Sequence, residues 1–240
     1  MRSFKAQVSF FMIIGVLAVL IISIALFTRN ANLKINTQKY GTYSNIYNSV
    51  DECISNALFY SAYYVGINGG YVYPRDTYAT PLGNLTVALK DNQSRIVTQD
   101  VIISNIETMM SDLIPICAND IFSKYSQYEI TAGQPFTQLT LTKNTIDAKV
   151  TYSVKIKEEG KETELKDFTV SQPIRLGFIV ASASEMINRY LANGDKFDIN
   201  YITGLDFNVK IIPYDARKAI VMTDMKSTVK DHPYIFIFLI

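Results

Sequence analysis

The longest apolar segment of the chain covers residues 8–27 and contains neither a charged residue nor a proline. A helix of about 20 residues rises about 30 Å, which is the thickness of the hydrocarbon core of a bilayer. Arg2 and Lys5 precede this segment and Arg29 follows it. The pattern predicts an N-terminal transmembrane helix over residues 7–28, followed by a chain that is polar enough to fold in water.

A second helical pattern begins after a polar stretch. Apolar and aromatic side chains recur at steps of three and four from Tyr43 to Tyr64, which gives an amphipathic helix one apolar face. Its predicted end is the GINGG sequence at 66–70, because glycine and asparagine adopt the left-handed conformation that ends helices. Residues 29–66 are therefore predicted to form a polar linker and an amphipathic helix, and residues 67–240 an α+β head.

Within the head, helical spacing alternates with strand spacing. Residues 102–113 predict a second helix, which Pro115 interrupts or kinks. Residues 146–157 alternate strictly between apolar and polar side chains, so they predict a strand with one wet face. Turn residues on both sides of this strand predict hairpin neighbours at 136–142 and 162–172.

The remainder of the head predicts one more helix, at 177–192, and strands at 207–211, 218–223 and 234–240. This order predicts an antiparallel sheet of about six strands packed with two to three helices, rather than a parallel sheet. The last run, YIFIFLI, is apolar at every position, which favours a strand in the interior of the sheet. The rival interpretation is that it pairs with the sheet edge of a neighbouring subunit.

Residues 5–9, KAQVS, place a basic residue, a small residue and Gln-x-Ser directly before the apolar helix. This pattern resembles the class III signal of archaeal type IV pilin-like proteins. The resemblance implies that a prepilin-type peptidase recognises Ala6, Gln7 and Ser9 and cuts between Ala6 and Gln7, so that residues 1–6 are a leader. It also implies that the apolar helix is kept as a membrane anchor and, after assembly, as part of a filament core.

One position departs from that family. Phe11 stands where the family often carries a glutamate that pairs with a neighbouring subunit during assembly, which bears on filament formation more than on anchoring. An uncleaved signal anchor is the alternative interpretation of the N-terminus. In either case we expect a single-pass protein of the cell membrane with its N-terminus in the cytoplasm and its C-terminal domain outside, because long trailing domains cross largely regardless of flanking charge.

Three further strings resemble a group of uncharacterised membrane-anchored proteins from small-genome archaea. They are CISNALFYSAYYVGINGGYVY, LIPICANDIF and HPYIFIFLI. This resemblance implies a fold and a location but no activity. The implied partners are the lipid bilayer, the prepilin-type peptidase, and copies of the chain itself or other pilin-like subunits.

Composition limits the chemistry that the chain can carry. Its 23 basic and 22 acidic residues nearly balance, so charge gives no reason to expect a nucleic acid partner. His232 is the single histidine of the chain, so the sequence has few of the residues that zinc sites and Ser-His-Asp triads require. Asp195, Asp198 and Asn200 lie close in sequence but lack the register of a calcium loop. We therefore predict no catalytic residue, no cofactor and no metal site.

Two covalent features are predicted for the head. Cys53 lies beside the apolar face of the amphipathic helix and Cys117 ends the second helix, so a disulfide between them is expected in an exported domain. Two buried free thiols are the alternative. Asn84 and Asn92 begin the sequons NLT and NQS, which are glycosylation acceptor patterns in predicted loops.

Nine tyrosines lie between Tyr40 and Tyr78. They are interpreted as packing residues, or else as an aromatic surface for a sugar or a partner protein. The sequence thus favours a pilin-like envelope protein with a structural or assembly role that is not catalytic; the alternative is a membrane-anchored extracytoplasmic binding or sensing module. A groove lined by these aromatics would favour binding, and an exposed helix face over 8–64 without a groove would favour assembly.

Overall fold

The structure, a computed structural model, describes residues 41–229 and 232–240. The predicted leader, the transmembrane helix over 7–28 and the processing residues Ala6, Gln7 and Ser9 lie outside the described residues. The chain divides into two compact units, Met1–Asn48 and Ser49–Ile240. The second unit is an α+β domain, which confirms the predicted class of the head.

The described helices follow the sequence pattern closely. A short 3-10 turn, η1 (Gly41–Tyr43), precedes α2 (Ser44–Ile67), and the second predicted helix is α3 (Gln99–Ser123). Thr98 caps α3 by accepting a hydrogen bond from the backbone N–H of Val101, and Pro115 lies inside this helix without ending it. The third predicted helix is α4 (Leu176–Ala192), and a short α5 (Ile199–Thr203) follows it.

The first large sheet is built around one long strand. It contains β5 (Glu129–Ala132), β6 (Phe136–Leu141), β7 (Ile146–Glu158) and β8 (Lys161–Gln172), with β5 and β6 paired to successive parts of β7 and β8 paired to its other side. The predicted alternation in β7 is confirmed, since its six apolar side chains are buried: Ile146, Ala148, Val150, Tyr152, Val154 and Ile156. Strand β5 was not predicted, because its residues show no alternation longer than four positions.

The second large sheet contains β9 (Asn208–Tyr214), β10 (Arg217–Val229) and β11 (His232–Leu239), all antiparallel. The prediction of one sheet with about six strands is therefore wrong, because the strands divide into two large sheets and two two-stranded hairpins. Alternation identifies which residues form strands, whereas the choice of partners depends on contacts between segments far apart in the chain. Helix α4 follows β8 directly, so the chain leaves the first sheet before β9 begins.

The strand predicted for the last residues exists, but it is not in the interior of a sheet. Strand β11 lies at an edge, with β10 as its one strand partner along its length. Its other edge is covered by different groups: the carbonyl oxygen of Leu239 accepts a hydrogen bond from the backbone of Ala88 at 2.7 Å. Ile235 and Ile237 are only partly buried, whereas the other apolar residues of the run are buried: Tyr234, Phe236, Phe238, Leu239 and Ile240. The end of α2 and the loop that contains Ala88 cover this edge in place of a second strand.

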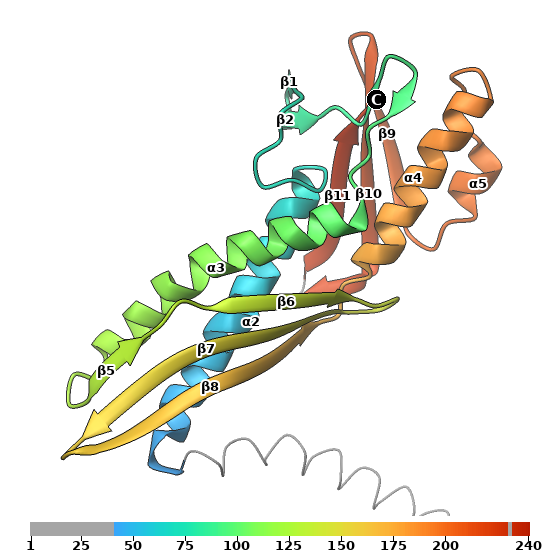
Figure 1. Cartoon of the computed structure of the whole chain (residues 1–240). Coiled ribbons are helices and arrows are strands. Elements are labelled where there is room, and N and C mark those ends of the chain that lie inside the picture. The colour runs from blue at the N-terminus through green and yellow to red at the C-terminus, as the bar shows by residue number, and fades with distance from the viewer. Residues whose placement is uncertain (1–40, 230–231) are drawn as a thin grey trace, which may run out of the picture. The chain divides into compact units, whose positions relative to one another are not determined.

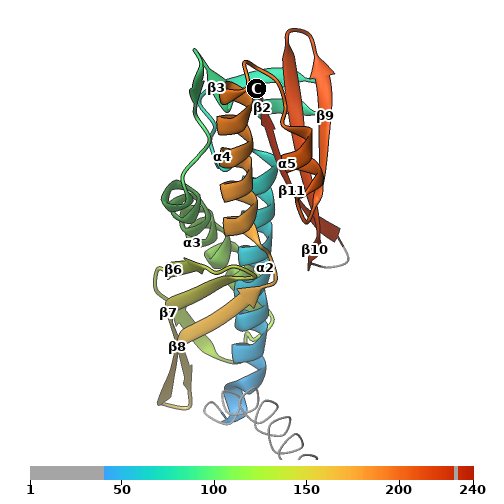
Figure 2. The same ribbon diagram turned by 90° about the vertical axis from the view of Figure 1, so that its right-hand side faces the viewer.

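Helix α2 connects the two sheets, which lie along successive lengths of it (Figures 1 and 2). Its Ser55 accepts hydrogen bonds from the amide of Gln172 on β8, at 3.0 Å, and the hydroxyl of Tyr234 on β11 donates to the carbonyl of Ala62 at 3.0 Å. The approach to β11 requires glycine at position 66, since a Cβ there would lie 2.6 Å from the carbonyl oxygen of Ile235.

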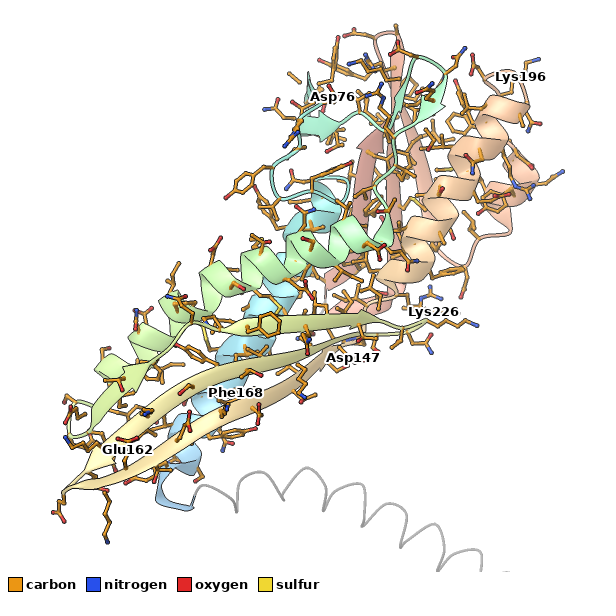
Figure 3. The ribbon with its side chains drawn as sticks, viewed as in Figure 1. Asp76, Asp147, Glu162, Phe168, Lys196 and Lys226 are labelled. Carbon is orange, nitrogen blue, oxygen red and sulfur yellow. A yellow bond between two sulfur atoms is a disulfide. The ribbon has the colours of Figure 1, made fainter. Side chains whose placement is uncertain are left out.

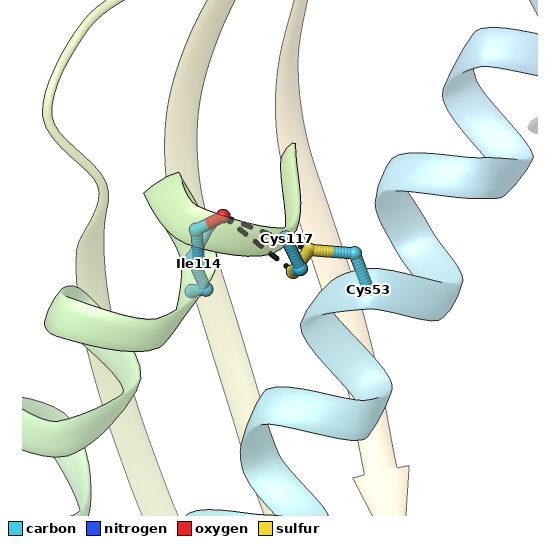
Figure 4. Close-up of a disulfide and its surroundings, with 3 residues drawn as sticks. All are labelled: Cys53, Ile114 and Cys117. Carbon is cyan, nitrogen blue, oxygen red and sulfur yellow. Dashed lines mark hydrogen bonds between the residues drawn. A yellow bond between two sulfur atoms is a disulfide. The ribbon is translucent and has the colours of Figure 1, made fainter. Parts of the chain in front are cut away.

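A disulfide joins α2 to α3. Cys53 and Cys117 are bonded, with their Cα atoms 6.0 Å apart, which confirms the predicted pair. Both sulfur atoms lie beside the carbonyl group of Ile114, at 3.7 and 3.5 Å (Figure 4). The bond closes a loop with a sequence separation of 64 residues, so it fixes the second helix against the first.

Helix α3 is the one helix in the described part of the chain that is long and apolar enough to cross a membrane. A core helix of a soluble domain can have the same length and composition. The contacts of α3 show how it packs in this fold. One stripe of α3 is buried, and on another side Glu107 accepts a hydrogen bond from the backbone of Leu139 on β6 at 2.8 Å. Figure 1 shows α3 running along β6.

A buried ion pair ties the start of α4 to β10. The guanidinium group of Arg175 donates to both carboxylate oxygens of Asp224, at 2.8 and 2.6 Å, and also to Asp206 at 3.0 Å. Asp224 lies where the pairing of β10 with β11 shifts register, and its side chain is fully buried. Lys226, two residues after Asp224 on β10, is labelled in Figure 3, and its ammonium group also contacts Asp206 at 2.6 Å.

Two small hairpins complete the domain. The first is formed by β1 (Thr77–Thr80) and β2 (Gly83–Thr86), and the second by β3 (Leu89–Lys90) and β4 (Gln93–Ser94). The turn of the β3–β4 hairpin is formed by Asp91 and Asn92, which both have positive φ, as a two-residue hairpin turn requires. Strand β1 and the start of β2 lie in a segment that is rich in turn residues, among them Pro74, Pro81 and Gly83.

Candidate ligand-binding cleft

A cleft of about 680 Å³ opens between the segment after α2, the strand β2, the hairpin β3–β4 and the first turns of α3. Its volume lies in the range of small-molecule sites, about 300–1,000 Å³. It is lined by Tyr71, Tyr73, Arg75, Asp76, Thr86, Val87, Arg95 and Asn105. Figure 3 shows Asp76 on the segment that leads into β1.

The segment that carries the tyrosines is irregular but is held at both ends. The backbone N–H of Val72 donates to the side-chain oxygen of Asn105 at 3.1 Å, and the same side chain donates to the carbonyl of Val101 at 2.7 Å. Further along, the carbonyl of Asp76 accepts a hydrogen bond from the backbone of Val87 at 2.9 Å. The wall of the cleft is therefore positioned before any ligand arrives, which lowers the entropy that binding must overcome.

The floor of the cleft is packed against the end of α2. Thr86 is buried and donates its hydroxyl to the carbonyl of Asn68 at 2.6 Å, just beyond the predicted helix end. Gly69 and Gly70 have positive φ, as predicted for the residues that end this helix. At Gly70 a Cβ would lie 2.0 Å from the side chain of Val97, so glycine at this position allows the loop to close under the cleft.

Charged groups line one side of the cleft. Asp76 lies 3.5 Å from the ammonium group of Lys90 and 3.7 Å from the guanidinium group of Arg95, and Arg95 also lies 3.8 Å from Asp91. These side chains are between 43% and 76% exposed, so the pairs contribute little to stability. With Arg75 included, three basic groups face two acidic groups, which leaves the site with a net charge of +1.

The two tyrosines of the cleft differ from the packing tyrosines of the same region. Tyr73 is 80% exposed and Tyr71 is partly exposed, whereas Tyr78 packs edge-on against Tyr214 and below the guanidinium group of Arg217. Because Tyr73 is 80% exposed, most of its apolar surface is in contact with water. A ligand that covers this surface would gain the free energy of apolar burial. The tyrosine-rich region thus contains both packing residues and a surface groove.

A second, smaller hollow of about 390 Å³ lies beside α2. It is lined by Phe59, Tyr60, Tyr63 and His232. This lining consists of three aromatic side chains and one imidazole. The second hollow therefore has fewer polar groups to orient a ligand than the first cleft.

The two sequons differ in accessibility. Asn92 lies at the tip of the β3–β4 hairpin, and it and the two residues that follow are exposed. Asn84 is exposed on β2, but the third residue of its sequon, Thr86, is buried and hydrogen-bonded. Of the two predicted acceptors, Asn92 is therefore the one that a glycosylating enzyme can reach in the folded domain.

The acidic residues near the end of α4 have a structural role. Asp198 caps α5 by accepting a hydrogen bond from the backbone of Tyr201 at 3.1 Å, and it pairs with Arg189 at 3.0 Å. These hydrogen bonds lower the pKa of the Asp198 carboxyl group. Among the residues that the structure describes, no group of three or more histidine, cysteine, aspartate or glutamate side chains is placed to hold a metal ion.

Comparison of the chain with protein-family models, with curated proteins and with solved structures finds no match.

Sequence reasoning identified the tyrosines as a candidate surface but missed the charged residues that accompany them. Arg75 and Asp76 lie in a turn-rich segment and Arg95 lies about 20 residues later, and nothing in their spacing shows that they converge. Asn105 lies on α3, more than 30 residues from the tyrosines. A clue was available in the clustering of arginine and tyrosine in YVYPRD, a short polar–aromatic string with few apolar neighbours.

Proposed function

We propose that this protein is a membrane-anchored, extracytoplasmic binding module. The single observation that supports this function best is the preformed cleft that contains Tyr71, Tyr73 and two arginines. A groove lined by the aromatic residues of this region is the feature that distinguishes binding from a purely structural role.

The proposed location has separate support. The disulfide between Cys53 and Cys117 is typical of a domain that folds in an oxidising environment outside the cytoplasm. The apolar segment at 8–27 has the length of a membrane anchor. An apolar anchor sequence followed by a disulfide-bonded head supports the proposal that the head lies outside the cytoplasm.

Calorimetric titration of the full chain in lipid nanodiscs tests the binding function. The probes are tetragalacturonate, its neutral methyl ester, hexaglutamate and hexaserine, applied to the wild type and to Tyr73→Ala. We expect at least one probe to bind saturably and Tyr73→Ala to weaken that binding about three- to tenfold, because aromatic contacts contribute about 0.5–1.5 kcal/mol. Absence of saturable binding for all four probes, or binding that Tyr73→Ala leaves unchanged, would contradict the proposal.

A pilin-like subunit is the second candidate function. The KAQVS sequence before the apolar segment favours it, and so does α2, a 24-residue helix packed against both sheets, since a long helix under a sheet-covered head is suited to assembly. N-terminal sequencing of the membrane-bound protein tests the processing step. A mature chain that begins at Gln7 supports this candidate, and one that begins at Met1 leaves a plain signal anchor.

A further inference from the structure

The chemistry of the cleft also indicates the class of its ligand, an inference that rests on the proposed binding function. We propose that the cleft binds an acidic saccharide, with a sugar ring against Tyr73 and a carboxylate or similar acidic group at Arg75 and Arg95. Three observations lead to this ligand class: the exposed tyrosines, the arginines that make no close side-chain hydrogen bond among the described residues, and the state of the backbone that lines the cleft.

The aromatic rings are suited to the face of a sugar. The face of a tyrosine ring carries partial negative charge, and the C–H groups on one face of a pyranose carry partial positive charge, so the two attract each other when stacked. Tyr73 presents its ring with 80% of its surface exposed. In the described part of the chain, neither Tyr71 nor Tyr73 contacts another aromatic ring within stacking distance, so their faces are available.

The arginines are suited to an anion. Arg95 approaches its two acidic neighbours only to 3.7 and 3.8 Å, which is beyond hydrogen-bond distance. Arg75 has no ion pair within the described ranges 41–229 and 232–240. A guanidinium group has five N–H donors in a planar fork that matches a carboxylate, so each arginine has donors to offer to an acidic ligand.

The state of the backbone favours a saccharide over a peptide. A peptide in a groove commonly gains affinity by pairing with exposed backbone groups of the protein. Here the backbone N–H groups of Val72 and Val87, which border the cleft, are already bonded within the protein. The side chains that remain to contact a ligand are phenols, guanidinium groups and one carboxylate, which are complementary to the hydroxyl and acidic groups of a sugar.

The test compares matched ligands and matched variants by calorimetry of the full chain in nanodiscs. Tetragalacturonate and its methyl ester have the same rings and differ in charge, and hexaglutamate carries acidic groups without rings. We expect tetragalacturonate to bind at least about tenfold more tightly than either, since a charge-assisted hydrogen bond contributes about 1.5–3 kcal/mol. Arg75→Gln and Arg95→Gln should each weaken its binding about tenfold, by the same conversion.

Lys196→Gln is the control variant, because Lys196 is an exposed cation between α4 and α5, away from the residues that line the cleft (Figure 3). It should leave binding unchanged. Equal binding of the methyl ester or of hexaglutamate would overturn the acidic saccharide while leaving a binding module in place. Equal losses in Lys196→Gln and Arg95→Gln would overturn it too, because binding would then depend on overall charge rather than on the cleft. Absence of binding by every probe would contradict both proposals.

Discussion

Replacing Asp224 by asparagine should remove much of the stability of the domain. The carboxylate is fully buried and accepts four hydrogen bonds: two from Arg175, at 2.8 and 2.6 Å, one from the hydroxyl of Ser227 at 2.5 Å and one from the backbone of Lys226 at 3.0 Å. Asparagine keeps the shape but has one acceptor oxygen and no charge. The variant therefore leaves a largely buried guanidinium group without its closest counter-charge.

We expect Asp224→Asn to lower the free energy of unfolding by about 3–5 kcal/mol, the usual effect of removing one partner from a buried ion pair. That is a large fraction of the 5–15 kcal/mol by which a typical domain is stable. Glu162→Gln is the matched control, because Glu162 pairs with Lys155 at 3.3 Å on the exposed face of the first sheet (Figure 3). Loss of that pair should cost less than about 1 kcal/mol.

The same residue gives the stability a defined pH dependence. Burial alone would raise its pKa, but hydrogen bonds from Arg175, Ser227 and the Lys226 amide outweigh burial and lower the pKa. A carboxyl group with a depressed pKa stabilises the fold above its unfolded pKa of about 3.9, and this contribution is lost as the pH falls through the folded value. The wild type should therefore lose more stability than Asp224→Asn on acidification below about pH 4.

The assay is denaturant unfolding of the full chain in detergent micelles, followed by near-ultraviolet circular dichroism at pH 7 and at pH 3. If the free energies of unfolding of Asp224→Asn and Glu162→Gln differ by less than about 1 kcal/mol at pH 7, the buried ion pair does not stabilise the contact between α4 and β10, which would contradict this prediction. A wild type and variant that lose equal stability on acidification would refute the argument about its pKa.

Three further predictions concern the rest of the domain. Gly66→Ala should destabilise the fold by about 1–3 kcal/mol despite the better helix propensity of alanine, because its Cβ would overlap the backbone of β11; thermal unfolding measures the loss. Reduction of the Cys53–Cys117 disulfide should cost about 4 kcal/mol by the loop-closure model, and an unchanged melting temperature after complete reduction would contradict this. If the native protein is glycosylated, peptide mass spectrometry should find the sugar at Asn92, and occupancy at Asn84 alone would show that modification precedes folding.

The sequence predicted the local structure of this chain well where one face of an element is buried. The alternation in β7 and the helical spacing in α3 and α4 follow directly from burial on one side. The disulfide was predictable because the helical register placed Cys53 and Cys117 toward the interior of a domain that the sequence predicts to be exported. In these cases the signal lies within a short window of the sequence.

The sequence did not predict which strands pair or which charged groups meet. The division into two sheets depends on contacts between segments far apart in the chain, and so does the cover of β11 by residues near Gly66 and Ala88. The ion pair of Arg175 with Asp224 spans 49 positions, and neither residue lies in a motif. The cleft was foreseen only through its tyrosines, because convergence of its arginines is a property of the folded chain.

The most direct test of a ligand-binding cleft is fluorine NMR of the full chain labelled with 3-fluorotyrosine. The signals of Tyr71 and Tyr73 are assigned by their loss in Tyr71→Phe and Tyr73→Phe, and those of the buried Tyr152 and Tyr234 serve as internal references. On titration with tetragalacturonate, we predict that the Tyr71 and Tyr73 signals shift saturably while both references stay in place. Binding that leaves the Tyr71 and Tyr73 signals unmoved would place the ligand elsewhere and contradict the account.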